Sequence, residues 1–164
     1  MNLADMLTYA DIGQLTAIAG RYQCECKRNS KHDLIQNILI TLGSREFMKA
    51  HIQECSVGDL RFMNMLLFDE RSYFSLEDLL AAARQATFDV PENKKGSYRE
   101  IVSRFKNSGW IFSGPSQQTR FLFQVPNDLK ERFRELMGEN IRERALISEE
   151  PEMYRDEGDM SIQD

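Results

Sequence analysis

The soft metal ligands of this chain lie in its N-terminal part, at Cys24, Cys26, His32, His51 and Cys55. Four such side chains can hold a zinc ion when pairs of them are spaced by two to four residues. A single residue separates Cys24 from Cys26, which is tighter than that spacing. We therefore expect no metal and no cofactor and interpret the cysteines as small apolar residues. A zinc site of Cys24, Cys26, His32 and Cys55 is the alternative interpretation.

Adjacent carboxylates, the residue type used for acid–base catalysis, occur at Asp69-Glu70 and Glu149-Glu150. The first pair falls at the expected end of a helix and the second in an acidic tail, so we interpret both as solvated. The chain also contains no phosphate-binding loop, nucleophile elbow or His-Glu-x-x-His pattern. We expect a protein that is not an enzyme.

Basic residues gather farther along the chain, around an expected helix that starts at Ser97. Ser97 and Glu100 have the spacing of a capping box, and Ile101, Val102 and Phe105 recur at helical spacing to form a buried face. The entry to this helix and its outer face carry five positive charges, at Lys94, Lys95, Arg99, Arg104 and Lys106.

Two further elements flank this basic helix. Before it, Ser75 is expected to cap a helix whose core face is formed by Leu76, Leu79, Leu80 and Ala83. After it, 110–112 and 119–125 are rich in aromatic and β-branched residues and flank a turn-forming segment at 114–118, which predicts a β-hairpin.

Helix, turn, basic helix and β-hairpin in this order resemble the winged helix-turn-helix family, over Asp69 to Leu136. The resemblance implies a DNA-binding domain in which Arg99 and Ser103 contact base edges and Arg120 lies close to the wing tip. It also implies phosphate contacts, which would come from Lys94, Lys95, Arg104, Lys106 and Arg120.

The N-terminal region is expected to be helical. A helix, a basic loop and a second helix over Ile12 to Leu42 resemble the SAP-type helix-extended-loop-helix module. That resemblance implies nucleic-acid contacts by Lys27, Arg28 and Lys31. The alternative is a plain helical hairpin whose charged loop is solvated.

Charge is distributed unevenly. The net charge is −5, but residues 149–164 hold seven acidic residues and one basic residue, so the rest of the chain is close to neutral. An acidic net charge therefore does not exclude a polyanionic partner. The tail is interpreted either as a solubilising disordered end or as an interaction segment that mimics nucleic acid.

We predict a mainly α fold with a small β-hairpin, divided into a helical module (1–68), a winged helix domain with a C-terminal helix (69–145) and a disordered acidic tail (146–164). No apolar run is long enough to span a membrane, and an odd number of cysteines fits a reducing cytoplasm.

The predicted function is non-catalytic binding of nucleic acid, with duplex DNA as the partner, in transcription regulation or as an accessory to replication or repair. The alternative is a protein–protein adaptor whose winged helix binds a polymerase or helicase while the acidic tail mimics nucleic acid. A homodimer formed through Met63, Leu66 and Leu67 or through the last helix is compatible with either.

Overall fold

The computed structural model describes residues 1–24, 30–90 and 98–152. Within these ranges the chain forms eight helices and one three-stranded antiparallel sheet. The expectation of a mainly helical fold with a small β-hairpin is therefore confirmed.

The first five helices are α1 (Leu3–Tyr9), α2 (Ile12–Arg21), α3 (Lys31–Gly43), α4 (Arg45–Gln53) and α5 (Val57–Leu67). Short polar side chains start four of them by accepting a hydrogen bond from the backbone amide three residues later. These caps are Asp11, Ser30, Ser44 and Ser56. The polar residues between the apolar stripes thus set where each helix begins.

The second half contains β1 (Phe74–Ser75), α6 (Leu76–Ala86), α7 (Tyr98–Asn107), β2 (Phe112–Ser113), β3 (Leu122–Gln124) and α8 (Asn127–Glu152). β2 and β3 form the expected hairpin. The sequence did not indicate β1, which pairs with the other side of β3 and gives the sheet the order β1-β3-β2. Phe74 lies opposite Phe123 in this sheet, so an aromatic pair stabilises the added strand.

One hydrophobic core extends across the boundary expected at residues 68 and 69. Buried side chains from Leu3 to Met137 form a single cluster. At its centre the ring of Trp110, just before β2, lies 5.2 Å from His51 of α4, 5.0 Å from Phe105 of α7 and 5.0 Å from Phe133 of α8. The two halves therefore share their core.

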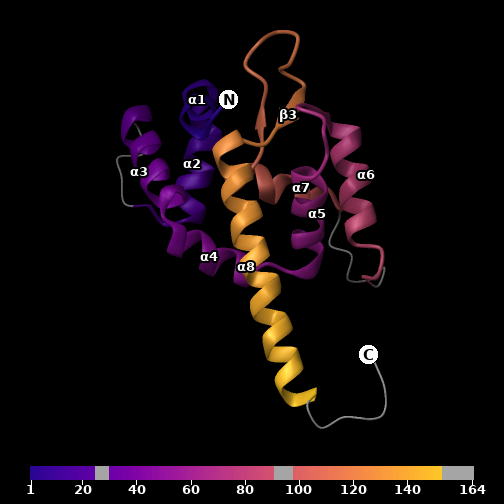
Figure 1. The fold of residues 1–164 in the computed structure, drawn as a ribbon. Coiled ribbons are helices and arrows are strands. Elements are labelled where there is room, and N and C mark those ends of the chain that lie inside the picture. Colours follow the sequence, from indigo (N-terminus) through magenta and orange to yellow (C-terminus); the bar gives the residue numbers. More distant parts are fainter. Residues whose placement is uncertain (25–29, 91–97, 153–164) are drawn as a thin grey trace.

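Helix α8 packs against α1, α4 and α5 of the first half and runs along the front of the molecule in Figure 1. Its arginines reach the C-terminal ends of other helices, where backbone carbonyls have no partner within their own helix. Arg132 donates a hydrogen bond to the carbonyl of Leu42 at 2.8 Å, and Arg134 donates one to the carbonyl of Leu67 at 2.5 Å. These two positive charges of α8 are thus used to hold α3 and α5.

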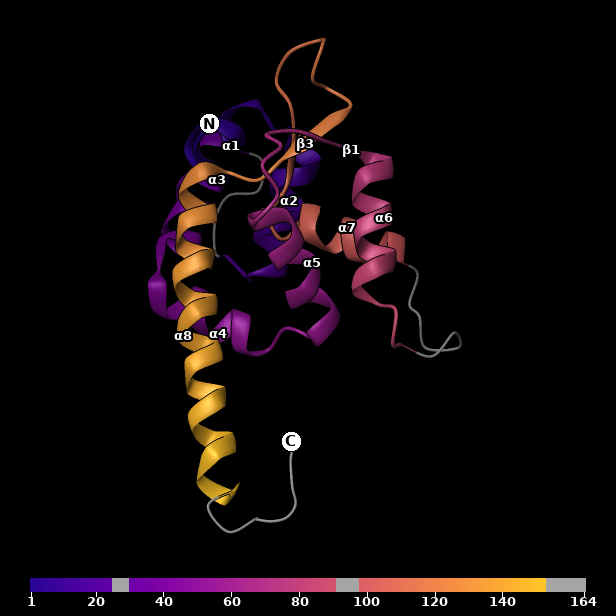
Figure 2. The same cartoon turned by 45° about the vertical axis from the view of Figure 1, so that its right-hand side comes forward.

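The far end of α8 projects beyond the body in two views (Figures 1 and 2). The helix continues to Glu152, so it includes the first residues of the segment that we expected to be a disordered tail. Residues 153–164 lie outside the described part of the chain.

Two expectations about surfaces can be compared with this fold. Met63, Leu66 and Leu67, which we considered as a homodimer contact, are at most 3% exposed and belong to the core. Among the helices described here, none combines the length and the apolar character that crossing a membrane requires.

Candidate nucleic-acid interface

Helix α7 is fixed by one apolar face and by a glycine at its end. Ile101, Val102 and Phe105 are buried, and the ring of Phe105 lies 4.7 Å from that of Phe62 in α5. Gly109 has φ +77° and follows the helix, where the amide of the next residue, Trp110, donates to the carbonyl of Phe105 at 3.1 Å. This is the Schellman arrangement, in which a left-handed residue ends a helix.

The opposite face of α7 is available at the surface. Arg99 and Ser103 are exposed and Lys106 is half-buried, and their spacing of four and three residues places them on one side of the helix. The N-terminal start of α7 is less fully described, because Ser97, the expected cap, lies outside the described residues. So do Lys94 and Lys95, two of the expected phosphate contacts.

These three α7 side chains border an open hollow of about 230 Å³. Its floor is apolar and is formed by Val102 of α7, Leu76 and Leu80 of α6, and Phe123 of β3. The Lys106 ammonium lies 5.5 Å from the centre of the Phe123 ring, in position for a cation–π interaction. The hollow therefore joins basic and polar groups to an apolar surface.

Leu76 was expected on the core face of its helix, and this expectation is wrong. Its side chain is 46% exposed, whereas Leu79 and Ala83 are fully buried as expected. Leu76 is the first residue of α6 and directly follows β1, so it lies at the edge of the hydrophobic core. Helical periodicity alone does not show where a core ends.

Arg104 points away from this face. Its guanidinium donates a hydrogen bond to Asp59 of α5 at 2.6 Å, and the Asp59 side chain is only 14% exposed. A carboxylate this well covered needs a partner of opposite charge. The structure therefore commits Arg104, an expected phosphate contact, to holding α7 against α5.

The loop between β2 and β3 projects from the body beside β3 (Figures 1 and 2). The amide of Gly114 donates to the carbonyls of Thr119 at 3.1 Å and Leu122 at 3.0 Å, which closes the base of the loop. The hydroxyls of Ser116 and Thr119 lie 2.7 Å apart and form a hydrogen bond across it. The loop is thus closed by its own polar groups.

Arg120 and Phe121 follow these contacts on the way to β3. Both are exposed, and the guanidinium carbon of Arg120 lies 4.6 Å from the centre of the Phe121 ring. Phe121 is 72% exposed. The sequence indicated Arg120 as a candidate contact but did not indicate its aromatic neighbour.

Of the other expected basic group, the structure describes only Lys31, which is not brought to this face. Lys27 and Arg28 lie outside the described residues, and Lys31 donates a hydrogen bond to the carbonyl of Thr8 at 2.7 Å. That contact ties the start of α3 to α1, and α2 contacts both α3 and α7 and lies between them. Lys31 and the α7 residues therefore belong to different surfaces.

The expected zinc ligands that the structure describes lie in different surroundings. His32 is exposed at the start of α3, Cys24 lies 3.5 Å from the hydroxyl of Thr41, and Cys26 lies outside the described residues. Burial raises the pKa of the Cys55 thiol to about 11, which opposes formation of the thiolate that binds metal. In residues 1–24, 30–90 and 98–152, no three His, Cys, Asp or Glu side chains are grouped closely enough to hold a metal ion.

His51 belongs to an aromatic cluster instead. Its ring lies 5.5 Å from Tyr22, 6.3 Å from Phe47 and 5.2 Å from Trp110. Burial lowers the pKa of His51, and the nearby Arg21 lowers it further. Burial also raises the pKa of the Tyr22 hydroxyl, which donates a 2.6 Å hydrogen bond to the Ser108 carbonyl. Both side chains are half-buried, and burial favours their neutral forms.

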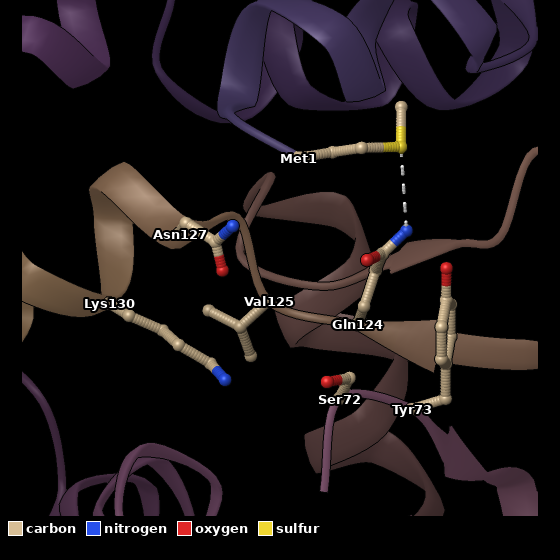
Figure 3. Close-up of a pocket in the computed structure, with 7 residues that line it drawn as sticks. All are labelled: Met1, Ser72, Tyr73, Gln124, Val125, Asn127 and Lys130. Carbon is tan, nitrogen blue, oxygen red and sulfur yellow. Dashed lines mark hydrogen bonds between the residues drawn. The ribbon is translucent and has the colours of Figure 1, made fainter.

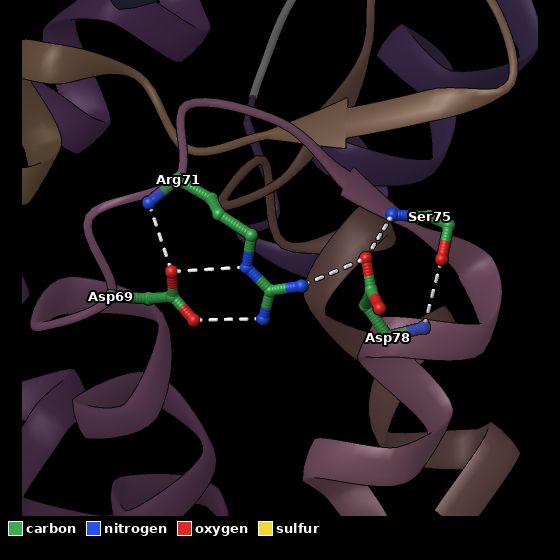
Figure 4. A network of polar contacts seen from close by, with 4 residues as sticks. All are labelled: Asp69, Arg71, Ser75 and Asp78. Atoms are coloured by element: carbon green, nitrogen blue, oxygen red, sulfur yellow. Dashed lines mark hydrogen bonds and ion pairs between the residues drawn. The ribbon is translucent and has the colours of Figure 1, made fainter.

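Asp69 of the first carboxylate pair has a structural role (Figure 4). It accepts hydrogen bonds from the backbone amide and the guanidinium of Arg71, which hold the pKa of its carboxyl at about 2. Arg71 also lies 3.1 Å from Asp78, whose carboxylate and Ser75 form the capping box of α6. The network fixes the segment between α5 and β1 and so positions α6 beside the hollow.

A second open hollow, also of about 230 Å³, lies near the start of α8 and is mainly polar (Figure 3). Lys130 and Asn127 of α8 line it together with Tyr73 and Gln124, and burial lowers the pKa of Lys130. The side-chain amide of Gln124 lies 3.9 Å from the sulfur of Met1. The backbone amide of Asn127 donates a hydrogen bond to the backbone carbonyl of Met1 at 2.9 Å. These contacts attach the start of the chain to α8.

We found no match to this chain among protein-family models, curated proteins or solved structures. The functional interpretation therefore depends on the geometry of the α7 face and the loop beside it.

Proposed function

We propose that this protein binds duplex DNA, without catalysis, through α7 and the loop between β2 and β3. The observation that carries the proposal is the stripe of exposed Arg99 and Ser103 and half-buried Lys106 on one side of α7, with a projecting loop that bears Arg120 beside β3. The order of α6, α7, β2 and β3 supports the proposal, because helix, basic helix and hairpin in this order resemble winged helix domains.

The proposed geometry follows from the size of the DNA grooves. A major groove about 12 Å wide admits one α-helix. With the exposed face of α7 in that groove, Arg99 near the start of the helix and Ser103 near its middle lie nearest the base edges. Lys106, one residue from the end of the helix, and Arg120 on the loop then contact phosphates.

The biological role that we propose is regulation of transcription or an accessory function in replication or repair. Binding is expected to be weak, because the proposed interface makes few phosphate contacts. Arg104 does not count among them because it is paired with Asp59.

Salt dependence tests the proposal directly. Each phosphate contact contributes about −0.9 to the slope of log affinity against log salt, so raising salt from about 50 to about 200 mM weakens binding roughly 3.5-fold per contact. We expect Lys106→Gln and Arg120→Gln each to reduce the slope by about 0.9 in a fluorescence anisotropy titration of a labelled random duplex.

Arg142→Gln is the matched control, since it removes an exposed arginine outside the proposed interface. Arg142 lies about 22 Å along α8 from Asn127, the first residue of the helix, which follows β3. The slope of this variant should equal that of the unchanged protein. Absence of binding at low salt, or binding that does not depend on salt, contradicts the proposal.

One observation favours a second function, that of a protein–protein adaptor. The exposed Leu76, with Leu80 and Phe123, gives the hollow an apolar floor that DNA does not require. A partner helix with apolar and acidic side chains would match this surface. Leu76→Ser is then expected to abolish binding of such a partner while leaving the salt slope for DNA unchanged.

A further inference from the structure

The exposed aromatic ring on the loop is the surface feature that binding to an intact duplex leaves unexplained. Phe121 is 72% exposed, although its neighbours in β3 pack inward and Phe123 is only 8% exposed. Arg120 covers one face of the Phe121 ring at 4.6 Å. The ring is therefore held as a flat apolar surface with a positive charge beside it.

The loop that leads to this ring is closed by close contacts of its own. Gly114 approaches Thr119 so closely that an added Cβ would lie 2.3 Å from the Thr119 side chain. The hydrogen bond between the Ser116 and Thr119 hydroxyls closes the same turn. A surface that is already ordered loses less entropy when it binds than a mobile one.

A nucleobase is the chemical group that fits such a surface. Aromatic side chains bind bases by stacking, and an arginine beside the ring adds a cation–π and a phosphate contact. Bases inside a duplex are already stacked on both faces. Only a base at an end, or one that has lost its pairing partner, offers a free face to a protein ring.

Phe121 lies close enough to α7 for one DNA molecule to contact both. Phe121 precedes Phe123 by two residues, and Phe123 contacts Lys106 of α7. Two residues of chain cover at most about 7 Å, or about two base steps of 3.4 Å. A duplex on α7 therefore brings a base within reach of Phe121 only a few steps away.

We propose that Phe121 stacks on an unpaired base where a duplex opens, so that the preferred ligand is a junction between double-stranded and single-stranded DNA. This inference depends on the proposed function, because α7 must hold the duplex arm of the junction. It assigns to the loop a specificity for the form of the DNA rather than for its sequence.

The experiment compares two labelled probes with equal numbers of phosphates. One is a fully paired duplex, and the other is the same length with mismatches over its last third. We expect the full-length protein to bind the mismatched probe about fivefold or more tighter, the lower end of what stacking of one base contributes. Phe121→Ala should remove this preference while Phe121→Trp retains it, and Phe121→Leu tests whether an apolar side chain without a ring suffices.

Phe88→Ala is the matched control. Phe88 is 69% exposed and also has an arginine over its ring, since the guanidinium carbon of Arg61 lies 4.9 Å from the ring centre. It follows the far end of α6, a helix of 11 residues that starts at β1, so it lies about 16 Å or more from the sheet. The preference should be unchanged in this variant.

The outcomes separate the two proposals. Equal affinity of the unchanged protein for both probes, or an equal loss for both probes in Phe121→Ala, overturns the junction inference and leaves duplex binding intact. Failure to bind either probe at low salt overturns the proposed function and the inference with it.

Discussion

Truncation of Phe133 should destabilise both halves of the molecule at once. Phe133 is fully buried in α8, and its ring lies 5.0 Å from Trp110, which in turn contacts His51 of the first half. Replacing a buried phenylalanine by alanine removes its transfer free energy and leaves a cavity, which together cost about 3–5 kcal/mol. We therefore expect Phe133→Ala to lower the free energy of unfolding by about that amount.

The assay is urea unfolding followed by tryptophan fluorescence and by circular dichroism. With an m-value of about 2 kcal/mol/M, the midpoint should fall by about 1.5–2.5 M. Trp110 is the single tryptophan and lies where α4, α7 and α8 meet, so its fluorescence reports the shared core. Because a common core unfolds cooperatively, the two signals should give the same midpoint.

Phe121→Ala is the matched control, because it removes the same side chain from a site that is 72% exposed. Its free energy of unfolding should change by no more than about 0.5 kcal/mol. If Phe133→Ala unfolds the protein altogether, the milder Phe133→Leu allows the same comparison. A cost below about 1 kcal/mol, or two transitions of which only one moves, would refute the idea of a shared core.

Two further measurements test local features of the structure. The pKa of His51 is lowered in the folded state, whereas in the unfolded chain it has the ordinary histidine value of about 6.5. The unfolded chain therefore binds the proton more readily, and the free energy of unfolding should fall as pH falls through that value. His51→Phe should reduce the difference in melting temperature between pH 7.5 and 5.5, and an unchanged difference contradicts this origin. Gly114→Ala places a Cβ 2.3 Å from Thr119 and should cost about 1–3 kcal/mol in urea unfolding. Gly43→Ala, with no atom within 4 Å of the added Cβ, should be neutral or stabilising, and equal effects of the two substitutions would argue against the packing of the loop.

Much of the secondary structure could be predicted because its signals are local. Ser75 caps a helix where the sequence indicated a cap, since a side-chain oxygen three residues before a backbone amide needs no tertiary partner. The apolar spacing of Ile101, Val102 and Phe105 likewise identified the buried face of α7. The basic residues on its opposite face followed from the same periodicity.

Long-range pairing was not accessible in this way. β1 has two residues and depends on β3, whose partner Phe123 lies 49 positions from Phe74. The pairing of Arg104 with Asp59, 45 residues away, also cannot be predicted from a sequence pattern. An arginine on a helix surface has the same local sequence whether it faces a carboxylate or solvent.

The amino-acid sequence by itself determined the helices, the hairpin and the basic character of α7, because each depends on residues a few positions apart. Tertiary structure decided which charges remain at the surface, through the pairing of Arg104 with Asp59 and the attachment of Arg132 to the end of α3. It also decided that Leu76 and Phe121 are exposed. Burial and ion pairing depend on distant segments that only the folded chain brings together, and for that reason the candidate interface became defined only in three dimensions.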